Sequence, residues 1–268
     1  MSFDSFRAAE RDGWNDRAAG YTNHTWLATG QIAPTLIRAV HLRPTHRLLD
    51  MACGTGNVTA AADALGCEAV GVDFAPDMVR QAQNAFPNVT FEMADAQDLP
   101  YAPASFDAVI CNMGLFHMTD PACAMAEAAR VLKPRGRFAW SQWCAPADSL
   151  LYATLFGILA GSADMSLAEP APDAFALSDA DNVKNLMEDA GFESFACDRL
   201  ETTLIAHGDD FFEFFLDFGV RVPLIVAAQS PQTRRIIRAQ VNSAMAPWKT
   251  TNGFEVPMPS FVYSGVKP

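Results

Sequence analysis

The stretch "RLLDMACGTGNVT", residues Arg47 to Thr59, decides the fold class. An apolar run ends in an acid, Asp50, and two glycines, Gly54 and Gly56, then precede a segment with a helical pattern. A buried strand, a glycine loop and a helix start in this order form the ligand-binding turn of open parallel sheets, because glycine lets the backbone approach a ligand closely. The stretch therefore predicts a binding site at the carboxyl end of the first strand.

The segments that follow alternate between strand and helix patterns, which indicates parallel strands joined by right-handed helical crossovers. We expect strands at residues 47–52, 68–73, 89–94, 105–113 and 136–143, then at 193–206 and 254–268. We expect helices at residues 57–65, 75–85, 121–132, 150–161 and 178–190. The predicted fold class is therefore α/β.

No linker separates two domains, so we expect a single domain over residues 1–268. Residues 1–42 have helical patterns and are expected to form N-terminal lid helices. Residues 208–248 form a mostly helical block outside the alternating core. Both segments are rich in aromatic residues, and together they are expected to cap the carboxyl ends of the strands.

Composition narrows the classes of partner. The 268 residues carry a formal net charge of -12, which repels phosphate backbones, so a nucleic-acid partner is not expected. No apolar run approaches the roughly 18 to 20 residues that span a bilayer, and the N-terminus lacks the apolar core of a signal peptide. The six cysteines form no C-x-x-C pair, and the five histidines show no metal-ligand spacing. We expect a cytoplasmic protein with a small-molecule partner and no metal.

Three acids at strand ends identify the ligand class. Dinucleotide sites use G-x-G-x-x-G, but Thr59 replaces the third glycine here. Asp50 would repel a pyrophosphate and would suit a cationic ligand. Asp73 ends the second strand, where an acid accepts from ribose hydroxyls, and Asp95 follows the third strand, where it would accept from the amine of an adenine. The ligand implied is adenosine with a cationic tail and no phosphates, a description that fits S-adenosylmethionine.

Four motifs at matching spacing resemble those of class I S-adenosylmethionine-dependent methyltransferases. They are "LLDMACGTGNVT" (48–59), "VGVDFAPDMV" (70–79), "MADAQDLPYAPASFDAVICNMGLFHM" (93–118) and "RVLKPRGRFAWSQW" (130–143). The subgroup they resemble includes quinone-biosynthesis C-methyltransferases and many small-molecule methyltransferases. The resemblance implies a Rossmann-like seven-stranded sheet with its last strand antiparallel and helices on both faces. It also implies S-adenosylmethionine as methyl donor and S-adenosylhomocysteine as product.

The resemblance further implies which residues hold the cofactor. Those expected along the methionine tail are Asp50, Ala52, Cys53, Gly54 and Gly56. Those expected around the ribose, the adenine and the cofactor floor are Asp73, Phe74, Met78, Asp95, Ala96, Asn112 and Met113. Tyr21, in "RAAGYTNHT", resembles the N-terminal tyrosine that reaches the cofactor in relatives, with lid packing as the other reading.

Catalytic and substrate residues are less sharply indicated. His117 follows the fourth strand and is the candidate for taking a proton from the acceptor, although a packing role stays open. His24 is a candidate substrate residue. Phe215 belongs to "FFEFFLDFGVRVPLIV", whose aromatic residues either line an apolar or aromatic substrate or form core and homodimer contacts.

Two other functions remain as alternatives to methyl transfer. A protein of this pattern could bind S-adenosylmethionine to catalyse or regulate another reaction. A nicotinamide-dependent oxidoreductase uses a similar sheet, but Asp50 and Thr59 argue against it. The methyl acceptor and its reacting atom are left open by the sequence.

Overall fold

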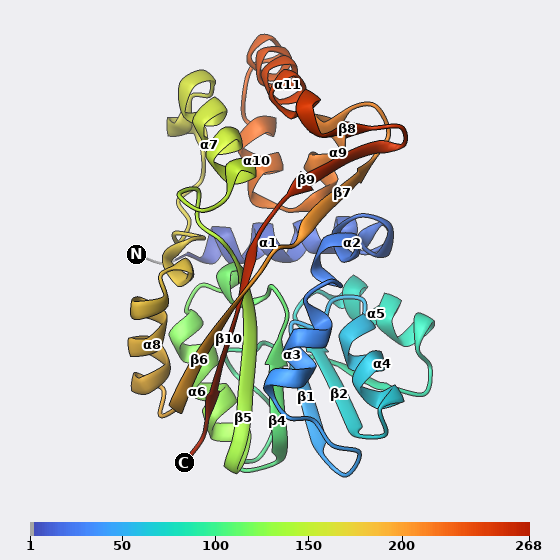
Figure 1. Cartoon of the computed structure of the whole chain (residues 1–268), viewed down its shortest axis with the longest axis vertical. Helices are drawn as coiled ribbons and strands as arrows, with labels where there is room; N and C mark the ends of the chain where they lie inside the picture. The colour runs from blue at the N-terminus through green and yellow to red at the C-terminus, as the bar shows by residue number, and fades with distance from the viewer. Residues whose placement is uncertain (1–2) are drawn as a thin grey trace.

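A computed structural model describes residues 3–268, and its centre is a seven-stranded sheet with strand order β3-β2-β1-β4-β5-β10-β6 (Figure 1). The strands are β1 (Arg47–Met51), β2 (Glu68–Asp73), β3 (Thr90–Met93), β4 (Phe106–Cys111), β5 (Leu132–Trp143), β6 (Glu193–Leu200) and β10 (Ser260–Val266). The first five strands run parallel, whereas β10 runs antiparallel to both of its neighbours. The predicted Rossmann-like sheet with an antiparallel last strand is confirmed.

Helices cover both faces of this sheet. They are α3 (Ala33–Ala39), α4 (Asn57–Ala64), α5 (Pro76–Ala85), α6 (Pro121–Val131) and α8 (Ala180–Asp189). Adjacent strand residues face opposite sides, so Leu48 packs with α3 and α4 while Leu49 packs with α6 and α8. Both leucines are fully buried, which explains why β1 appears in the sequence as a continuous apolar run.

Helix capping follows from local sequence. The Asp120 carboxylate accepts from the Cys123 backbone N–H at 3.0 Å and caps α6, and Asp179 caps α8 in the same way. After α8 the chain turns at Gly191, whose φ of +89° favours glycine.

Two segments expected to be single strands are each divided in two. Residues 193–206 form β6 and then β7 (Thr203–His207), and residues 254–268 lie in β9 (Gly253–Pro257) and then β10. Pro259 has no N–H to donate to a ladder, and at the same level Thr202 hydrogen-bonds to Met258 through backbone and side chain. The two paired segments therefore leave the central sheet as β7 and β9. With β8 (Lys249–Thr250) they form a second, three-stranded sheet in the order β7-β9-β8.

The helices that are not layered on the central sheet gather around this second sheet and beyond the carboxyl ends of β1 to β5 (Figure 1). They are α1 (Asp4–Arg17), α2 (Thr25–Thr29), α7 (Leu150–Ser162), α9 (Phe211–Phe218), α10 (Arg221–Ala227) and α11 (Pro231–Met245). Short 3-10 helices complete the chain: η1 (Tyr21–Asn23), η2 (Leu115–His117), η3 (Met165–Leu167), η4 (Ala176–Ser178) and η5 (Ala246–Trp248). All five phenylalanines of α9 are buried, so this helix is covered on more than one side.

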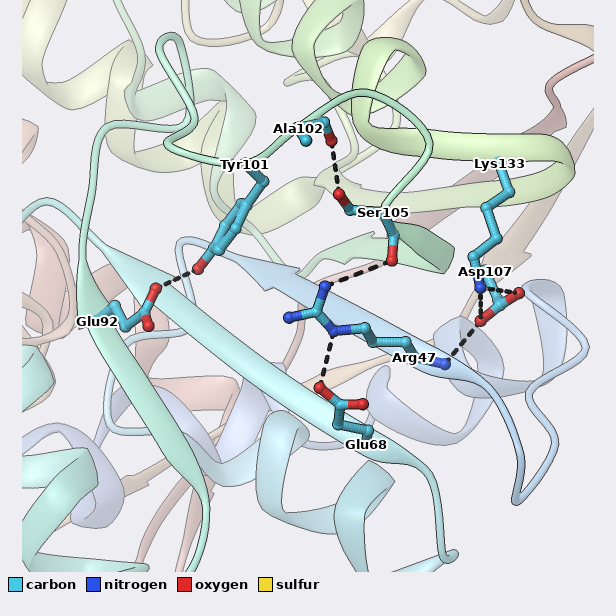
Figure 2. A network of polar contacts seen from close by, with 8 residues as sticks. All are labelled: Arg47, Glu68, Glu92, Tyr101, Ala102, Ser105, Asp107 and Lys133. Atoms are coloured by element: carbon cyan, nitrogen blue, oxygen red, sulfur yellow. Dashed lines mark hydrogen bonds and ion pairs between the residues drawn. The ribbon is translucent and has the colours of Figure 1, made fainter.

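The opposite edge of the sheet, where the parallel strands begin, carries a network of paired charges (Figure 2). Arg47 donates to Glu68 at 2.8 Å, and Lys133 donates to both oxygens of Asp107 at 2.8 Å. Asp107 also accepts from the backbone N–H of Arg47 at 2.9 Å. These charges satisfy one another at the start of β1 and β4, so we assign them a structural role. Within residues 3–268 no helix has the length and apolar character needed to cross a membrane.

Candidate cofactor and substrate site

A cavity of about 510 Å³ lies at the carboxyl ends of the parallel strands. Its walls come from the loops after β1 to β5, from α1 and from the α9–α10 region. The predicted site residues that line it are Tyr21, Ala52, Gly54, Asp73, Phe74, Met78, Asp95, Ala96, Asn112, Met113, His117 and Phe215. Residues chosen from separate motifs thus meet in one place.

Asp50 lies beneath the glycine loop and is only 1% exposed. Its Oδ2 accepts from the Thr59 hydroxyl at 2.7 Å, while its Oδ1 has no hydrogen-bonding partner among the described residues. Burial raises the pKa of this carboxyl to about 7. Asp50 lines a small second pocket together with Tyr21, Ala52 and Cys53. A buried acid with a spare acceptor beside the loop fits the cationic amino-acid end of S-adenosylmethionine.

The two loop glycines have different roles. Gly54 has a φ of +55°, and the atoms nearest to a Cβ there would be those of Tyr21, at 3.7 to 3.9 Å, so the backbone has space for a ligand to approach. Gly56 has a φ of +81° and lies at the start of α4, outside the cavity lining. A Cβ on Gly56 would come within 2.5 Å of the Phe91 ring, so this glycine permits close packing. Cys53 is also outside the main cavity, and burial raises its pKa well above the usual range.

Asp73 ends β2 and lies at the wall of the cavity with 6% of its surface exposed. Its two carboxylate oxygens accept from the backbone N–H groups of Gly54 and Ala75, each at 2.9 Å. Burial raises the pKa of Asp73, and these hydrogen bonds oppose that rise. Because each carboxylate oxygen accepts more than one hydrogen bond, the pair can still accept from two ribose hydroxyls.

Phe74, Met78, Asp95 and Ala96, the residues predicted to surround the adenine, line one part of the cavity. Asp95 accepts from the Gln97 backbone N–H at 2.9 Å and forms an ion pair with Arg7 of α1. Arg7 was absent from the predicted site, because its partner lies far away in the sequence. This ion pair fastens the N-terminal helix to the predicted adenine site.

The floor of the cavity is held by a hydrogen-bond network around Asn112. The Asn112 amide donates to the Thr29 carbonyl at 3.1 Å, and its Oδ1 accepts from the Ser141 hydroxyl at 2.8 Å. Ser141 Oγ in turn accepts from the backbone N–H of Met113, whose φ is +56°. The network joins the ends of β4 and β5 to α2 and fixes the loop between Asn112 and His117.

His117 contacts α1 through a buried carboxylate that the sequence analysis did not single out. Its Nδ1 lies 2.9 Å from Glu10 Oε2, and Glu10 is 1% exposed. The Trp14 indole donates to the same oxygen at 3.1 Å, and its ring packs edge-on against the imidazole with centroids 5.0 Å apart. The spacing of Glu10 and Trp14 predicts that these two side chains lie on the same face of a helix. It does not predict their contact with His117.

His24 is the predicted substrate residue that does not reach the cavity. Its ring nitrogen pairs with the Gly20 carbonyl at 3.1 Å, and its ring packs against Phe214 with centroids 5.4 Å apart. His24 is absent from the cavity lining because its position before α2 turns the ring toward α9. Phe215, one residue further along α9, does line the cavity.

Comparison with known proteins gives a consistent family assignment. Residues 49–140 match the family model described as a methyltransferase domain. A methyltransferase of Bacillus subtilis, YcgJ, is 32% identical over 143 residues, which cover 52% of this chain and 56% of that protein. A demethylmenaquinone methyltransferase of Renibacterium salmoninarum is 29% identical over 181 residues, covering 64% and 76%. The crystal structure of YcgJ superposes with a TM-score of 0.59 at 19% identity, covering 89% of this chain and 98% of that chain.

Residues 49–140 therefore match a methyltransferase domain, and the sequence and fold of the chain are similar to those of class I S-adenosylmethionine-dependent methyltransferases. Within that class the domain is similar to the quinone C-methyltransferases. The matched region of YcgJ is little more than half of that protein, at 56%.

Proposed function

We propose that the protein transfers a methyl group from S-adenosylmethionine to a small apolar or aromatic molecule. The observation that carries this proposal is that one cavity joins the acids of the methyltransferase motifs to an aromatic wall. A volume of about 510 Å³ is within the range of small-molecule sites.

The donor side of the cavity has the chemistry of this cofactor. Asp50 and Asp73 place two carboxylates beside the Gly54 loop, which favours a cation and disfavours a pyrophosphate. We propose that Asp73 holds the ribose, that Phe74, Met78, Asp95 and Ala96 surround the adenine, and that Asn112 and Met113 form the floor.

The acceptor side is mostly apolar. Phe215 and Phe218 of α9, Val222 and Ile225 of α10, and Trp143 at the end of β5 line the remaining wall. An apolar or aromatic molecule would displace water from these side chains, and burial of apolar surface is worth roughly 25 cal/mol per Å².

S-adenosylmethionine supplies a methyl group that is already activated by its sulfonium. The protein's tasks are therefore to align the acceptor at roughly 3 to 3.5 Å from that carbon and to exclude water. We propose that residues 1–42 and 208–248 act as a cap for this purpose. Support comes from Tyr21 and Trp14 on one side and Phe215 and Val222 on the other, which all line the same cavity.

The test is a methyl-transfer assay with methyl-labelled S-adenosylmethionine and a panel of phenols, quinones, amines and carboxylic acids. We expect label in an extractable organic product together with S-adenosylhomocysteine, and less label with the Asp73→Ala variant at subsaturating S-adenosylmethionine. S-adenosylhomocysteine binding without label in any acceptor would instead support the alternative of a cofactor-binding protein without methyl transfer.

A further inference from the structure

We propose that Glu10 is a positioning residue that orients His117 as the general base, so that the acceptor loses a proton during methyl transfer. This inference rests on the proposed function and adds a property of the substrate to it. The observation behind it is the buried contact between α1 and η2, where Glu10 Oε2 and His117 Nδ1 are 2.9 Å apart.

The contact selects one tautomer of the imidazole. A carboxylate only accepts, so Nδ1 must carry the hydrogen that it donates to Glu10. The neutral ring then has its lone pair on Nε2, which has no hydrogen-bonding partner in residues 3–268. His117 lines the cavity, and its charge would act on the carboxylate of Asp73, so the ring is near the predicted cofactor. Nε2 is thus the atom available to a substrate.

The surroundings make the orientation specific. Glu10 is buried, and its Oε2 receives the Trp14 indole N–H in addition to His117. The Trp14 and Phe116 rings pack on the imidazole with centroids 5.0 and 4.2 Å away. A carboxylate held behind an imidazole fixes the tautomer and stabilises the imidazolium that forms when the ring takes a proton.

A hydroxyl group is an acceptor that must release a proton when it is methylated. A bond forms between the acceptor oxygen and the methyl carbon, and the carbon–sulfur bond breaks with its electron pair remaining on sulfur. The acceptor's proton moves to Nε2 of His117, and the resulting positive charge faces the Glu10 carboxylate. Since Glu10 lies on α1, the base is complete only when the N-terminal helix is seated.

The test begins with the histidine itself. In protein labelled with ¹⁵N-histidine, two-bond NMR spectra of the S-adenosylhomocysteine complex should show His117 protonated at Nδ1 and bare at Nε2. The signal is assigned by its loss in His117→Gln. Glu10→Ala should shift this ring toward the Nε2–H form, whereas Asp12→Asn, an exposed acid on the same helix, should leave it unchanged. A wild-type ring protonated at Nε2 alone would overturn the proposal, with or without a known acceptor.

Kinetics with a phenol from the methyl-transfer panel give the second readout. Glu10→Ala should lower kcat by about 100-fold with KM and S-adenosylhomocysteine affinity nearly unchanged, because proton transfer typically contributes about 10²- to 10⁴-fold. Glu10→Asp should recover part of the rate, and it also serves if the alanine variant does not fold. Wild-type kcat in a folded Glu10→Ala protein would show that Glu10 only anchors α1. Absence of methyl transfer in the wild type would refute the proposed function and leave the tautomer result standing.

A separate observation concerns Arg221, at the start of α10. We infer that the acceptor carries an anionic group, such as a carboxylate, that binds the Arg221 guanidinium. Arg221 lines the cavity among apolar residues and forms no hydrogen bond or ion pair within the described part of the chain. Arg7, by contrast, is already paired with Asp95.

The charges around Arg221 do not neutralise it directly. Glu10 and Glu169 act on it only through space, and burial lowers the pKa of the guanidinium, which nevertheless stays charged. Glu10 is itself engaged by His117 and Trp14. A half-buried cation without a partner costs free energy, and a carboxylate can recover that cost through two parallel hydrogen bonds.

Binding to the S-adenosylhomocysteine complex tests this inference, with phenolic carboxylic acids and their uncharged amides as matched probes. Calorimetry should give at least about tenfold tighter binding for the acids. Arg221→Gln should remove the difference, Arg221→Lys should keep part of it, and Arg234→Gln, an exposed arginine of α11, should leave it intact. Equal binding of acids and amides to the wild type, or no binding of any acid in the series, would overturn the inference. If the wild type still bound S-adenosylhomocysteine, the proposed function would remain standing.

Discussion

Replacing Asp50 with asparagine should remove a pH-dependent loss of stability. Burial raises the pKa of Asp50 from 3.8 to about 7, so the folded protein retains a proton that the unfolded chain releases. Between these two values the unfolded state binds fewer protons, and the free energy of unfolding therefore falls as pH rises. The shift of about 3 units corresponds to a loss of about 4 kcal/mol at most, complete above about pH 7. Asparagine keeps an oxygen for the Thr59 hydroxyl and carries no charge.

The assay is urea unfolding of both proteins without ligand, from about pH 5 to pH 8. The free energy of unfolding of Asp50→Asn relative to wild type should rise by about 2 kcal/mol between about pH 5 and pH 7 and then level off. Comparing the two proteins at each pH cancels groups that titrate equally in both. Asp12→Asn, with its exposed carboxylate, should track the wild type. A constant difference between Asp50→Asn and wild type across this range would show that burial does not raise the pKa of Asp50 in the folded protein.

Three further predictions concern the cofactor, the loop and the cap. Asp73→Ala should weaken S-adenosylmethionine binding by about 1.5 to 3 kcal/mol, because hydrogen bonds to a charged acceptor are lost. Calorimetry that shows unchanged affinity in a folded variant would exclude Asp73 as the residue that binds the ribose. Gly56→Ala should lower the free energy of unfolding by about 1 to 3 kcal/mol, because φ is +81° and the Phe91 ring leaves no space for a Cβ. Gly157→Ala, in an open helical position, should not lower it. Equal urea midpoints for Gly56→Ala and wild type would contradict this prediction. Deleting residues 1–26 should leave the circular dichroism of the sheet but reduce turnover strongly, and full turnover would exclude a capping role for this segment.

The central sheet and the acids of the site could be predicted because their signals are local. The strands β1, β2 and β4 are short apolar runs, α6 and α8 begin at capping aspartates, and the carboxyl ends of parallel strands meet at one edge. Asp50 and Asp73 lie at the carboxyl ends of neighbouring strands, so their positions in the sequence already imply that they lie close together.

The second sheet, the Glu10–His117 contact and the Arg7–Asp95 ion pair could not be predicted in this way. Each depends on a pairing between residues far apart in the chain, such as Thr202 with Met258 or Arg7 with Asp95. The turn of His24 toward Phe214 likewise depends on where α9 packs. Local patterns indicated that these segments are helical or extended, but not what they contact.

We propose that the Gly54 loop and Asp73 bind S-adenosylmethionine rather than a dinucleotide. Calorimetric titration of the wild-type protein with S-adenosylhomocysteine, and separately with NAD, tests this most directly. We predict saturable binding of one S-adenosylhomocysteine per chain and no binding of NAD, because Asp50 and Asp73 disfavour a pyrophosphate beside the loop. Binding of NAD with no heat from S-adenosylhomocysteine would rule out this cofactor assignment and favour an oxidoreductase.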